Sequence, residues 1–315
     1  MKRAIITGAT GAIGTALIEE LISADIEILV FIRENSQRKD NIKNHPLIQK
    51  RYCSLDHLAE IRNETGKEYD VFYHLAWAGS SGTGRNDMYM QNLNVKYALD
   101  AVGAAERFGC KVFIGAGSQA EYGRVEGILK PETPAFPEMG YGYAKLCAGH
   151  MTREYASQRG LRHIWVRILS VYGPNDGARS MIMSTIYKLQ NGIIPEFTKG
   201  EQMWDYLYSG DAAKALHMLG ENGIDKKVYV LGSGIARPLA EYIQDIRGIV
   251  NPACEIALGA IPYSEKQVMY LCADISELIN DTGWNTAIDF KDGIRMILNN
   301  ECRWEGLCHA EDKTK

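Results

Sequence analysis

The stretch "TGATGAIG" at residues 7–14 lies between a short apolar run and the first helical pattern of the chain, and it supplies Gly8, Gly11 and Gly14. Glycines at this spacing allow a tight strand-to-helix turn, let a pyrophosphate approach the backbone, and leave the N–H groups of the helix N-terminus free for phosphates. Any tight turn of this kind needs glycine, so the motif alone is a weak signal. Its place in the first strand and helix favours a dinucleotide site over a merely structural turn.

Short apolar runs alternate with helical patterns through the first half of the chain. Because these runs are apolar on both faces, they predict strands of a parallel sheet that helices cover on both sides. The alternation of strand and helix predicts a Rossmann-like, doubly wound α/β fold. The predicted strands are "AIIT" near the N-terminus and residues 26–32, 70–76, 111–115 and 163–169.

The regular alternation ends near residue 171, where proline and glycine begin to separate shorter elements. This change predicts a smaller second α/β domain laid over the first. We expect the first domain to comprise residues 1–170 and 205–235, with residues 227–232 returning to its sheet as one more parallel strand. The second domain is then formed by residues 171–204 and 236–305, followed by a polar tail at 306–315.

The composition is that of a globular protein, since 46% of the 315 residues are apolar and 23% are charged. A net charge of -4 gives no general reason to expect nucleic acid or an anionic membrane as a partner. Seven scattered cysteines, without a CxxC pair or a histidine at metal-ligand spacing, indicate reduced thiols and no metal site. No run approaches the roughly 20 apolar residues of a membrane helix. The sequence therefore predicts a soluble, cytoplasmic protein.

The residue that follows the second predicted strand indicates which dinucleotide would bind. A carboxylate there would accept the ribose 2′-OH of NAD, whereas a guanidinium would pair with the 2′-phosphate of NADP. Arg33 occupies this position, nineteen residues after Gly14, with Ser36 and Arg38 close behind. We therefore expect NADP(H). Glu34 could instead turn inward and take the NAD role, so NAD(H) stays open.

Tyr141 and Lys145 are four residues apart at the start of a predicted helix, so they share one helix face. The pKa of a free phenol is about 10, and we expect the nearby ammonium to lower it. Ser118, in "SQAEYG", follows a central strand, where open α/β sheets bind their ligands. These residues could instead be a turn residue and a surface aromatic. If they face one crevice, Tyr141 exchanges a proton with a substrate oxygen, Ser118 hydrogen-bonds that oxygen, and Lys145 tunes Tyr141 and holds the cofactor ribose.

Several further motifs occur along nearly the whole chain. In order, they are the glycine turn, "YHLAW" at 73–77, Asn94, "GSQAEYG" at 117–123, Tyr141 with Lys145, "VRILSVYGP" at 166–174, "GEQMWDYLYSGDAAKA" at 200–215, "LGSGIARPL" at 231–239 and "TGWNT" at 282–286. In this number and order they resemble an extended short-chain dehydrogenase/reductase acting on nucleotide sugars, of the NAD-dependent epimerase/dehydratase family.

The resemblance implies roles for individual residues. In the family, the serine, tyrosine and lysine at these positions form the catalytic triad, carried here by Ser118, Tyr141 and Lys145. The second domain would bind the nucleotide sugar, and the family often forms a homodimer through the two helices that follow Asn92 and Tyr141. The implied dinucleotide contacts are Gly8, Thr10, Gly11, Ile13, Gly14, Arg33, Leu55, Leu75, Ala76, Tyr141 and Lys145.

The two residues after Ser118 bear on the reaction. Dehydratases of the family carry an Asp–Glu pair there, because loss of water needs an extra acid and base. This chain has Gln119 and Ala120, neither of which transfers a proton usefully, so dehydration is disfavoured. Glu121 comes next, and strand alternation predicts that it points away from the face carrying Ala120.

Reduction and epimerisation remain. An epimerase keeps its cofactor, commonly NAD, whereas a reductase consumes NADPH, so Arg33 favours a reductase. The motifs "GSQAEYG" and "QMWDYLY" are most similar to those of CDP-sugar 4-ketoreductases of the CDP-abequose and CDP-paratose synthase type. We predict NADPH-dependent reduction of a nucleotide-linked, preferentially CDP-linked, 4-keto-6-deoxy or 3,6-dideoxy sugar, with hydride transfer to C4 and Tyr141 as proton donor. An NAD-dependent nucleotide-sugar 4-epimerase is the alternative, and a non-catalytic dinucleotide sensor is a second.

Substrate contacts are predicted on the basis of the same resemblance. Relatives in the epimerase and dehydratase branches commonly have an arginine where this chain has Trp204, and that arginine contacts the diphosphate. Arg179 and Arg237 are therefore the candidates for the diphosphate here, although either could be an ordinary surface cation. The predicted substrate-binding residues are Ser118, Gln119, Arg179, Trp204 and Arg237.

Overall fold

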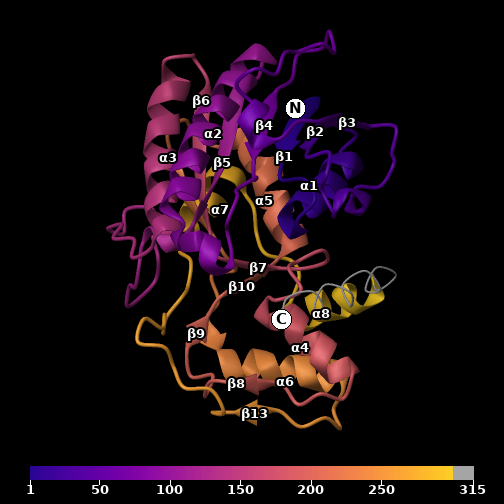
Figure 1. The fold of residues 1–315 in the computed structure, drawn as a ribbon, viewed down its shortest axis with the longest axis vertical. Helices are drawn as coiled ribbons and strands as arrows, with labels where there is room; N and C mark the ends of the chain where they lie inside the picture. The colour runs from indigo at the N-terminus through magenta and orange to yellow at the C-terminus, as the bar shows by residue number, and fades with distance from the viewer. Residues whose placement is uncertain (301–315) are drawn as a thin grey trace.

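The main sheet of the protein has seven parallel strands (Figure 1), and the computed structural model describes residues 1–300 of the chain. The strands are β1 (Arg3–Thr7), β2 (Glu27–Ile32), β3 (Ile48–Tyr52), β4 (Val71–His74), β5 (Val112–Ser118), β6 (Arg162–Ile168) and β11 (Val228–Leu231). Their order is β11-β6-β5-β4-β1-β2-β3, so the chain changes direction across the sheet between β1 and β4. Ligands of open α/β sheets bind at the carboxyl ends of the strands beside such a switch. The predicted Rossmann-like fold is confirmed.

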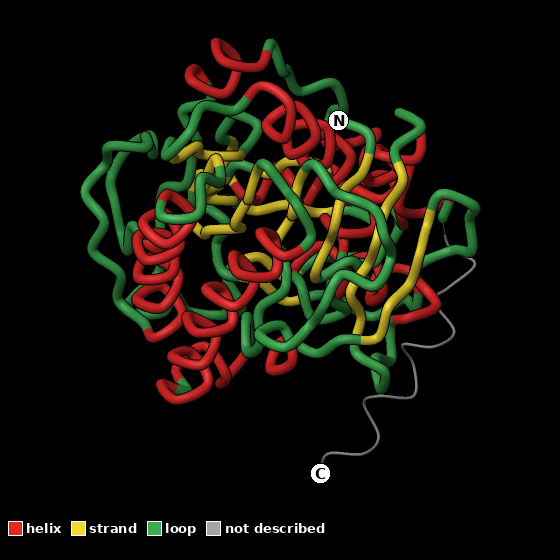
Figure 2. The backbone as a smooth tube through the Cα atoms, turned by 90° about the horizontal axis from the view of Figure 1, so that it is seen from above, coloured by secondary structure: helices red, strands yellow, loops and turns green. Residues whose placement is uncertain are grey.

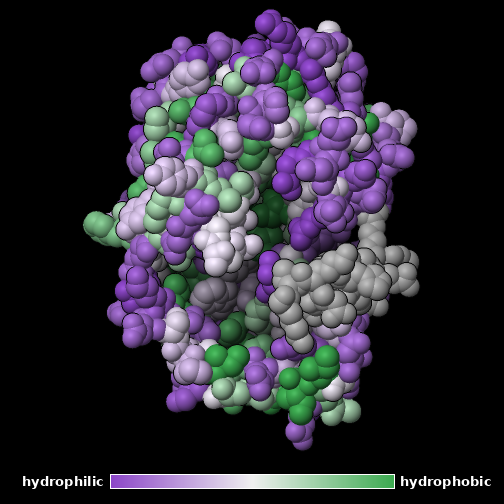
Figure 3. Space-filling view, viewed as in Figure 1, coloured by the Kyte–Doolittle hydropathy of each residue, from purple (hydrophilic) through white to green (hydrophobic). Residues whose placement is uncertain are grey.

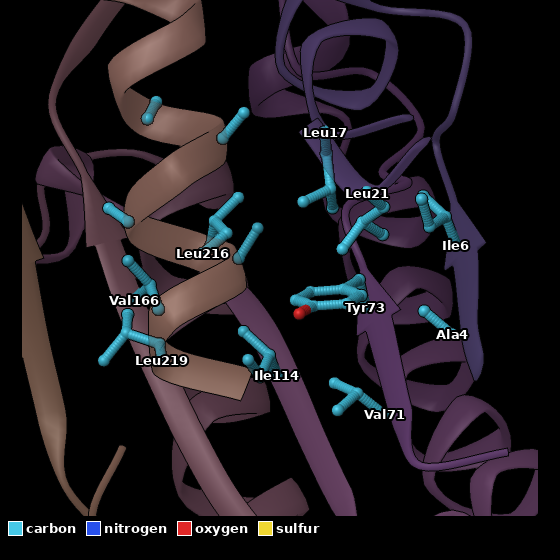
Figure 4. Packing of buried hydrophobic residues seen from close by; sticks show 14 of the residues in the cluster. Ala4, Ile6, Leu17, Leu21, Val71, Tyr73, Ile114, Val166, Leu216 and Leu219 are labelled. Atoms are coloured by element: carbon cyan, nitrogen blue, oxygen red, sulfur yellow. The ribbon is translucent and has the colours of Figure 1, made fainter. Parts of the chain in front are cut away.

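Two helix pairs cover the sheet, and Figure 2 shows the strands between helices. The pairs are α1 (Ala12–Ser23) with α5 (Ser209–Asn222) on one face, and α2 (Met88–Arg107) with α3 (Gly140–Ser157) on the other. Neighbouring residues of β1 face opposite layers, as a pleated strand requires. Ile6 belongs to the cluster that contains Leu17 of α1 and Leu216 of α5 (Figure 4). Ile5 belongs to the cluster that contains Ala101 of α2.

A second region lies beyond the carboxyl ends of the main strands, in the lower part of Figure 1. It has its own apolar core, in which the rings of Tyr242 and Phe290 meet at 4.6 Å between centroids. Its elements include helices α4 (Met181–Gln190), α6 (Leu239–Val250) and α8 (Phe290–Asn299) and the two-stranded pairs β8 (Glu196–Phe197) with β13 (Ala257–Leu258) and β9 (Met203–Trp204) with β12 (Arg237–Pro238).

The chain passes between the two regions more than once. Strands β7 (Ser170–Tyr172) and β10 (Tyr206–Tyr208) pair at the junction, and α5 and β11 then return to the main sheet. The strand predicted at residues 227–232 is β11, which pairs in parallel with β6. The division of the chain into two domains stays our interpretation. The last residues of the predicted second domain, 301–305, and the predicted tail at 306–315 lie outside the residues that the structure describes. The remaining elements are α7 (Ser276–Thr282) and the 3₁₀ helices η1 (Lys39–Asn41), η2 (Leu55–His57), η3 (Gly82–Asn86) and η4 (Gln119–Glu121).

Figure 3 shows hydrophilic residues over much of the visible face of the main-sheet region, with apolar residues recessed toward the second region. Within residues 1–300, no helix is long and apolar enough to cross a membrane. In the same residues, no three or more His, Cys, Asp and Glu side chains form a group that could hold a metal ion.

Candidate functional site

The glycine turn between β1 and α1 is packed too tightly for side chains. Gly8 has a φ of +74°, and a Cβ on it would lie 2.6 Å from the amide nitrogen of Ala76 and 2.7 Å from the carbonyl carbon of Leu75. A Cβ on Gly14 would collide with the carbonyl oxygen of Gly8. Helix α1 begins after Gly11, whose side chain cannot cap it, and its first turn carries no acidic residue. The turn therefore leaves backbone close to the surface and an uncapped helix N-terminus, which fits the pyrophosphate of a dinucleotide.

The other predicted dinucleotide contacts lie at the same edge of the sheet. Arg33 is exposed directly after β2, and half-buried Leu55 begins η2 after β3. Leu75 and Ala76 directly follow β4. Because β4, β1, β2 and β3 are adjacent and parallel, their carboxyl ends form one continuous edge. The structure therefore brings these predicted residues into one row beside the glycine turn.

The glycine turn is also braced from η1, a contact that the sequence did not reveal. The side-chain amide of Asn41 donates a hydrogen bond to the carbonyl oxygen of Thr10 at 3.0 Å. Ile13, in the first turn of α1, is half-buried. Thr10 and Ile13 therefore lie in the turn and at the helix start, as predicted, and the position of Thr10 is fixed by a residue 31 positions later.

Ser118 is the last residue of β5 and the N-cap of η4. Its Oγ accepts a hydrogen bond from the Ala120 N–H at 3.2 Å, and the Glu121 carboxylate accepts one from the Ser118 N–H at 2.8 Å. This is a capping box. The prediction that Glu121 follows strand alternation is wrong, because the chain leaves the strand at Ser118 and residues 119–121 turn as a 3₁₀ helix. Gln119, beside Ser118, has a buried Oε1 without a hydrogen-bond partner in the described residues.

Tyr141 and Lys145 lie in the first turns of α3 and reach the end of β5. Lys145 is buried, donates a hydrogen bond to the Ala116 carbonyl oxygen at 2.6 Å, and places its Nζ 3.8 Å from the centre of the Trp77 ring. The Tyr141 ring meets the same Trp77 ring edge-on at 6.1 Å. The Tyr141 hydroxyl also interacts with the Ser118 side chain. Ser118, Tyr141 and Lys145 therefore face one site.

The electrostatics of this site differ from our expectation. Burial raises the pKa of Tyr141, and the Ser118 hydrogen bond and the Arg85 guanidinium act in the opposite direction without reversing it. Burial also lowers the pKa of Lys145 to about 7, although the negative charge of Glu121 acts to raise it. The prediction of a lowered Tyr141 pKa is therefore wrong in direction. The reason is that desolvation disfavours a buried phenolate, and the Lys145 ammonium is directed to Ala116 and Trp77.

Arg85 is a residue of this site that the sequence analysis missed. Its guanidinium carbon lies 4.5 Å from the centre of the Tyr141 ring, and its Nε contacts the Met139 sulfur at 3.2 Å. Within residues 1–300 it forms no ion pair with a carboxylate. The sequence did offer one signal, because Arg85 is the only cation in residues 78–87. In the structure, Ala78, the first residue of this loop, forms two hydrogen bonds with the buried Asn94.

Within residues 1–300, none of the residues predicted to bind the diphosphate forms a hydrogen bond, ion pair or ring contact with Ser118, Tyr141 or Lys145. Arg237 forms ion pairs with Glu241 at 3.1 Å and Asp245 at 2.9 Å, so its charge is already compensated. Trp204 is the register partner of Arg237, and its indole N–H donates to the Ser170 Oγ at 2.9 Å. Arg179 is exposed before α4 and forms no ion pair within residues 1–300. Of the two arginines, Arg179 is therefore the freer cation.

A cavity of about 540 Å³ that is lined by described residues lies elsewhere. It lies between α1, the start of α5 and α8, and none of the three predicted catalytic residues lines it. The lining includes Thr15, Asn41, Asn175, Tyr208 and Ile297. The candidate site is therefore defined by the converging side chains at the carboxyl end of β5 and by the adjoining glycine turn.

Comparison with known proteins gives the same family that the sequence motifs resemble. Residues 4–232 match the NAD dependent epimerase/dehydratase family. CDP-abequose synthase of Salmonella typhimurium is 23% identical over 303 residues, which cover 93% of this chain and 96% of that protein.

Two solved structures illustrate the similarity of fold. The UDP-glucose 4-epimerase of Thermus thermophilus, in complex with NAD, superposes with a TM-score of 0.83 at 19% identity, covering 94% of this chain and 98% of that one. RMD of Pseudomonas aeruginosa, complexed with NADPH, has a TM-score of 0.79 at 22% identity, with 95% and 98% covered. The match to the family covers well over half of the chain. The chain therefore belongs to the NAD dependent epimerase/dehydratase family and is an NAD(P)-dependent enzyme of the extended short-chain dehydrogenase/reductase type.

Proposed function

We propose that the protein reduces a nucleotide-linked 4-keto-6-deoxy or 3,6-dideoxy sugar at C4 with NADPH. The observation that carries the proposal is the convergence of Ser118, Tyr141 and Lys145 at the end of β5, followed by Gln119 and Ala120 instead of a pair of acids. This set can exchange a proton with a carbonyl oxygen, but it lacks the acid and base for dehydration. The similarity to CDP-abequose synthase supports a nucleotide-sugar substrate, with a CDP-linked sugar as our first choice.

The protein groups fit the reductive direction. A bound nicotinamide cofactor would supply the hydride. Because burial raises the Tyr141 pKa, the phenol stays protonated at neutral pH and can give its proton to the oxygen on C4. Ser118 Oγ accepts the Ala120 N–H, so when a substrate takes the place of Tyr141 as its partner, the Ser118 hydroxyl can donate its hydrogen to the same oxygen. An epimerase that begins by oxidising its substrate would need the phenolate first.

The proposal includes a preference for NADPH, because Arg33 follows β2 at the edge where the adenosine ribose would lie. We expect Arg33→Ala to raise the Kd for NADPH by about 10- to 100-fold, as expected for losing a charge-assisted hydrogen bond, with little effect on NADH. The two Kd values can be measured by nucleotide fluorescence. Arg295→Ala, which removes an exposed arginine of α8 paired with Asp292, is the control. Equal losses for both cofactors would contradict the assignment of Arg33 to the 2′-phosphate.

The test of the proposed reaction is the NADPH absorbance on addition of CDP-, UDP-, dTDP- and GDP-linked 4-keto-6-deoxyhexoses. We expect stoichiometric oxidation of NADPH with the preferred sugar and formation of its 4-hydroxy product. The alternative, a 4-epimerase, predicts that the purified protein carries stoichiometric NAD and interconverts two nucleotide sugars without net oxidation of NADPH. A dinucleotide sensor would bind NADPH and turn over no sugar.

We also propose that the enzyme is a cytoplasmic homodimer, with the outer surfaces of α2 and α3 as the interface. Both helices expose large apolar side chains to solvent in the single chain. Those on α2 are Met88, Tyr89 and Leu93, and those on α3 are Tyr143 and Met151. Such a patch is a common mark of a protein–protein interface.

A further inference from the structure

Glu121 is a charged side chain that the proposed reaction does not use directly. It is fully buried, although it follows the active-site serine by only three residues. Its carboxylate accepts hydrogen bonds from the Trp165 indole N–H at 3.0 Å and from the Arg167 Nε at 2.8 Å. Both partners come from β6, the strand next to β5. An unpaired buried carboxylate is very unfavourable, and here the Arg167 guanidinium and the Trp165 indole N–H provide its partners.

The surroundings keep this carboxylate in one position. A Cβ on Gly117 would lie 2.5 Å from the Glu121 Oε1 and would also collide with the Trp165 indole nitrogen. Gly115 and Gly149 likewise leave room only for the Trp165 ring. Arg167 is held in turn by a hydrogen bond to the Pro131 carbonyl oxygen at 3.1 Å. The glycines of "IGAGS" thus make space for a rigid cluster of charged and aromatic side chains behind the end of β5.

This cluster touches the candidate catalytic residues through the backbone of β5. The Glu121 carboxylate accepts the Ser118 N–H, so it fixes the turn that presents the Ser118 hydroxyl. Lys145 donates to the carbonyl oxygen of Ala116, two residues earlier on the same strand. The Glu121 carboxylate lies against Gly117, between these two contacts.

The charged and titratable groups around Lys145 come from three elements. Tyr141 lies on α3, its own helix, with its ring centre 5.7 Å from the Lys145 Nζ. His74 lies on β4, and burial, assisted by the positive charge of Lys145, lowers the pKa of His74 to about 3. Glu121 lies on η4 and opposes the loss of the Lys145 proton. The neighbouring imidazole is neutral at this pKa, and the phenol pKa is raised, so Glu121 is the group among these three whose negative charge acts on Lys145.

We propose that Glu121 is a positioning residue, whose buried carboxylate fixes the Ser118 turn and places a negative charge beside the segment of β5 to which Lys145 donates. The part that concerns catalysis rests on the proposed function, whereas the part that concerns Lys145 does not. Glu121 itself contacts neither substrate nor cofactor in this scheme, since it lies behind the strand.

The Glu121→Gln variant tests the electrostatic part directly. Glutamine keeps an oxygen that can accept the Ser118 N–H but removes the charge. Without the negative charge, Lys145 should lose its proton more readily, so its titration midpoint should move to lower pH. The midpoint is measured by NMR of protein with ¹³C-labelled lysine, with the Lys145 signal identified by its loss in Lys145→Arg. This readout requires no sugar substrate and no turnover.

The activity of the same variant tests the catalytic part. We expect kcat to fall by about 10- to 100-fold, as for a misplaced catalytic group. We also expect the alkaline limb of the kcat/KM profile to begin at lower pH, because activity requires protonated Lys145. Glu27→Gln, at a half-buried glutamate that pairs with Lys67 at the start of β2, is the matched control and should change neither the pH profile nor kcat. If the wild-type protein reduces no 4-keto sugar, the proposed reaction fails, but the NMR titration still decides the role of Glu121 toward Lys145.

A double variant covers the case in which Glu121→Gln folds poorly because Arg167 is left without its counter-ion. Glu121→Gln combined with Arg167→Met removes both charges and relieves that penalty. We expect the double variant to unfold close to the wild-type temperature and still to show the lowered Lys145 midpoint and the reduced kcat. A Lys145 midpoint that matches the wild-type value in both variants, or full recovery of kcat in the double variant, would overturn the proposal.

Discussion

Replacing Tyr141 by phenylalanine is expected to lower kcat for the 4-keto sugar by about 10³-fold or more, at the upper end of what a lost general acid costs. The substitution removes only the phenol oxygen, so the edge contact with Trp77 and the stacking of Arg85 over the ring remain. We therefore expect the Kd for NADPH and the melting temperature to stay close to those of the wild type. Steady-state kinetics, fluorescence binding and thermal unfolding measure the three quantities.

Tyr143→Phe is the control for this experiment, because Tyr143 lies two residues further along the same helix, is exposed in the single chain and belongs to the proposed dimer surface and not to the site. It should leave kcat unchanged. A Tyr141→Phe variant with near-wild-type turnover would show that another group supplies the proton. Loss of NADPH binding in that variant would mean that the phenol is part of the cofactor contact and not primarily an acid.

Replacing Gly8 by alanine is expected to disable the cofactor site and to destabilise the fold. The alanine would have to keep a φ of +74° and place its Cβ 2.6 Å from the Ala76 nitrogen. The left-handed backbone and the overlap together should lower the free energy of unfolding by about 2 to 4 kcal/mol. Since the turn must shift to relieve the overlap, the Kd for NADPH should rise by more than about 10-fold. Urea unfolding and fluorescence binding measure the two effects.

Gly248→Ala is the matched control, because Gly248 lies inside α6 with nothing within 4 Å of the added Cβ and without a positive φ. It should leave NADPH binding unchanged and should not destabilise the protein, since alanine is the better helix former. Wild-type stability in Gly8→Ala would contradict the tight packing of the turn against the chain after β4.

The fold could be predicted because each of its signals is local. Apolar runs on both faces of the strands, and the glycine turn after β1, follow from the chemistry of neighbouring residues. Such signals also place Ser118 at a strand end and Tyr141 with Lys145 on one helix face. The family resemblance, which the match over residues 4–232 bears out, rested on the number and order of the motifs.

The interior of the site could not be predicted in the same way, because its contacts join residues far apart in the chain. The partners of Glu121 on β6 lie 44 and 46 residues later, and Arg85 lies 56 residues before Tyr141. Strand alternation failed at Glu121 because a period of two holds only while the strand continues.

The sequence by itself therefore determined six of the seven strands of the main sheet, the glycine turn and the residue types that meet at the end of β5. It missed the edge strand β3, none of whose residues is fully buried, so that the strand is not an apolar run. Only the tertiary structure decided their electrostatic state. Burial raises the Tyr141 pKa, although the charge of Arg85 acts to lower it. Burial also lowers the Lys145 pKa to about 7, although the charge of Glu121 acts to raise it. The physical reason is that a pKa depends on desolvation and on the nearest charges in space, and both are set by packing between elements that local sequence does not specify.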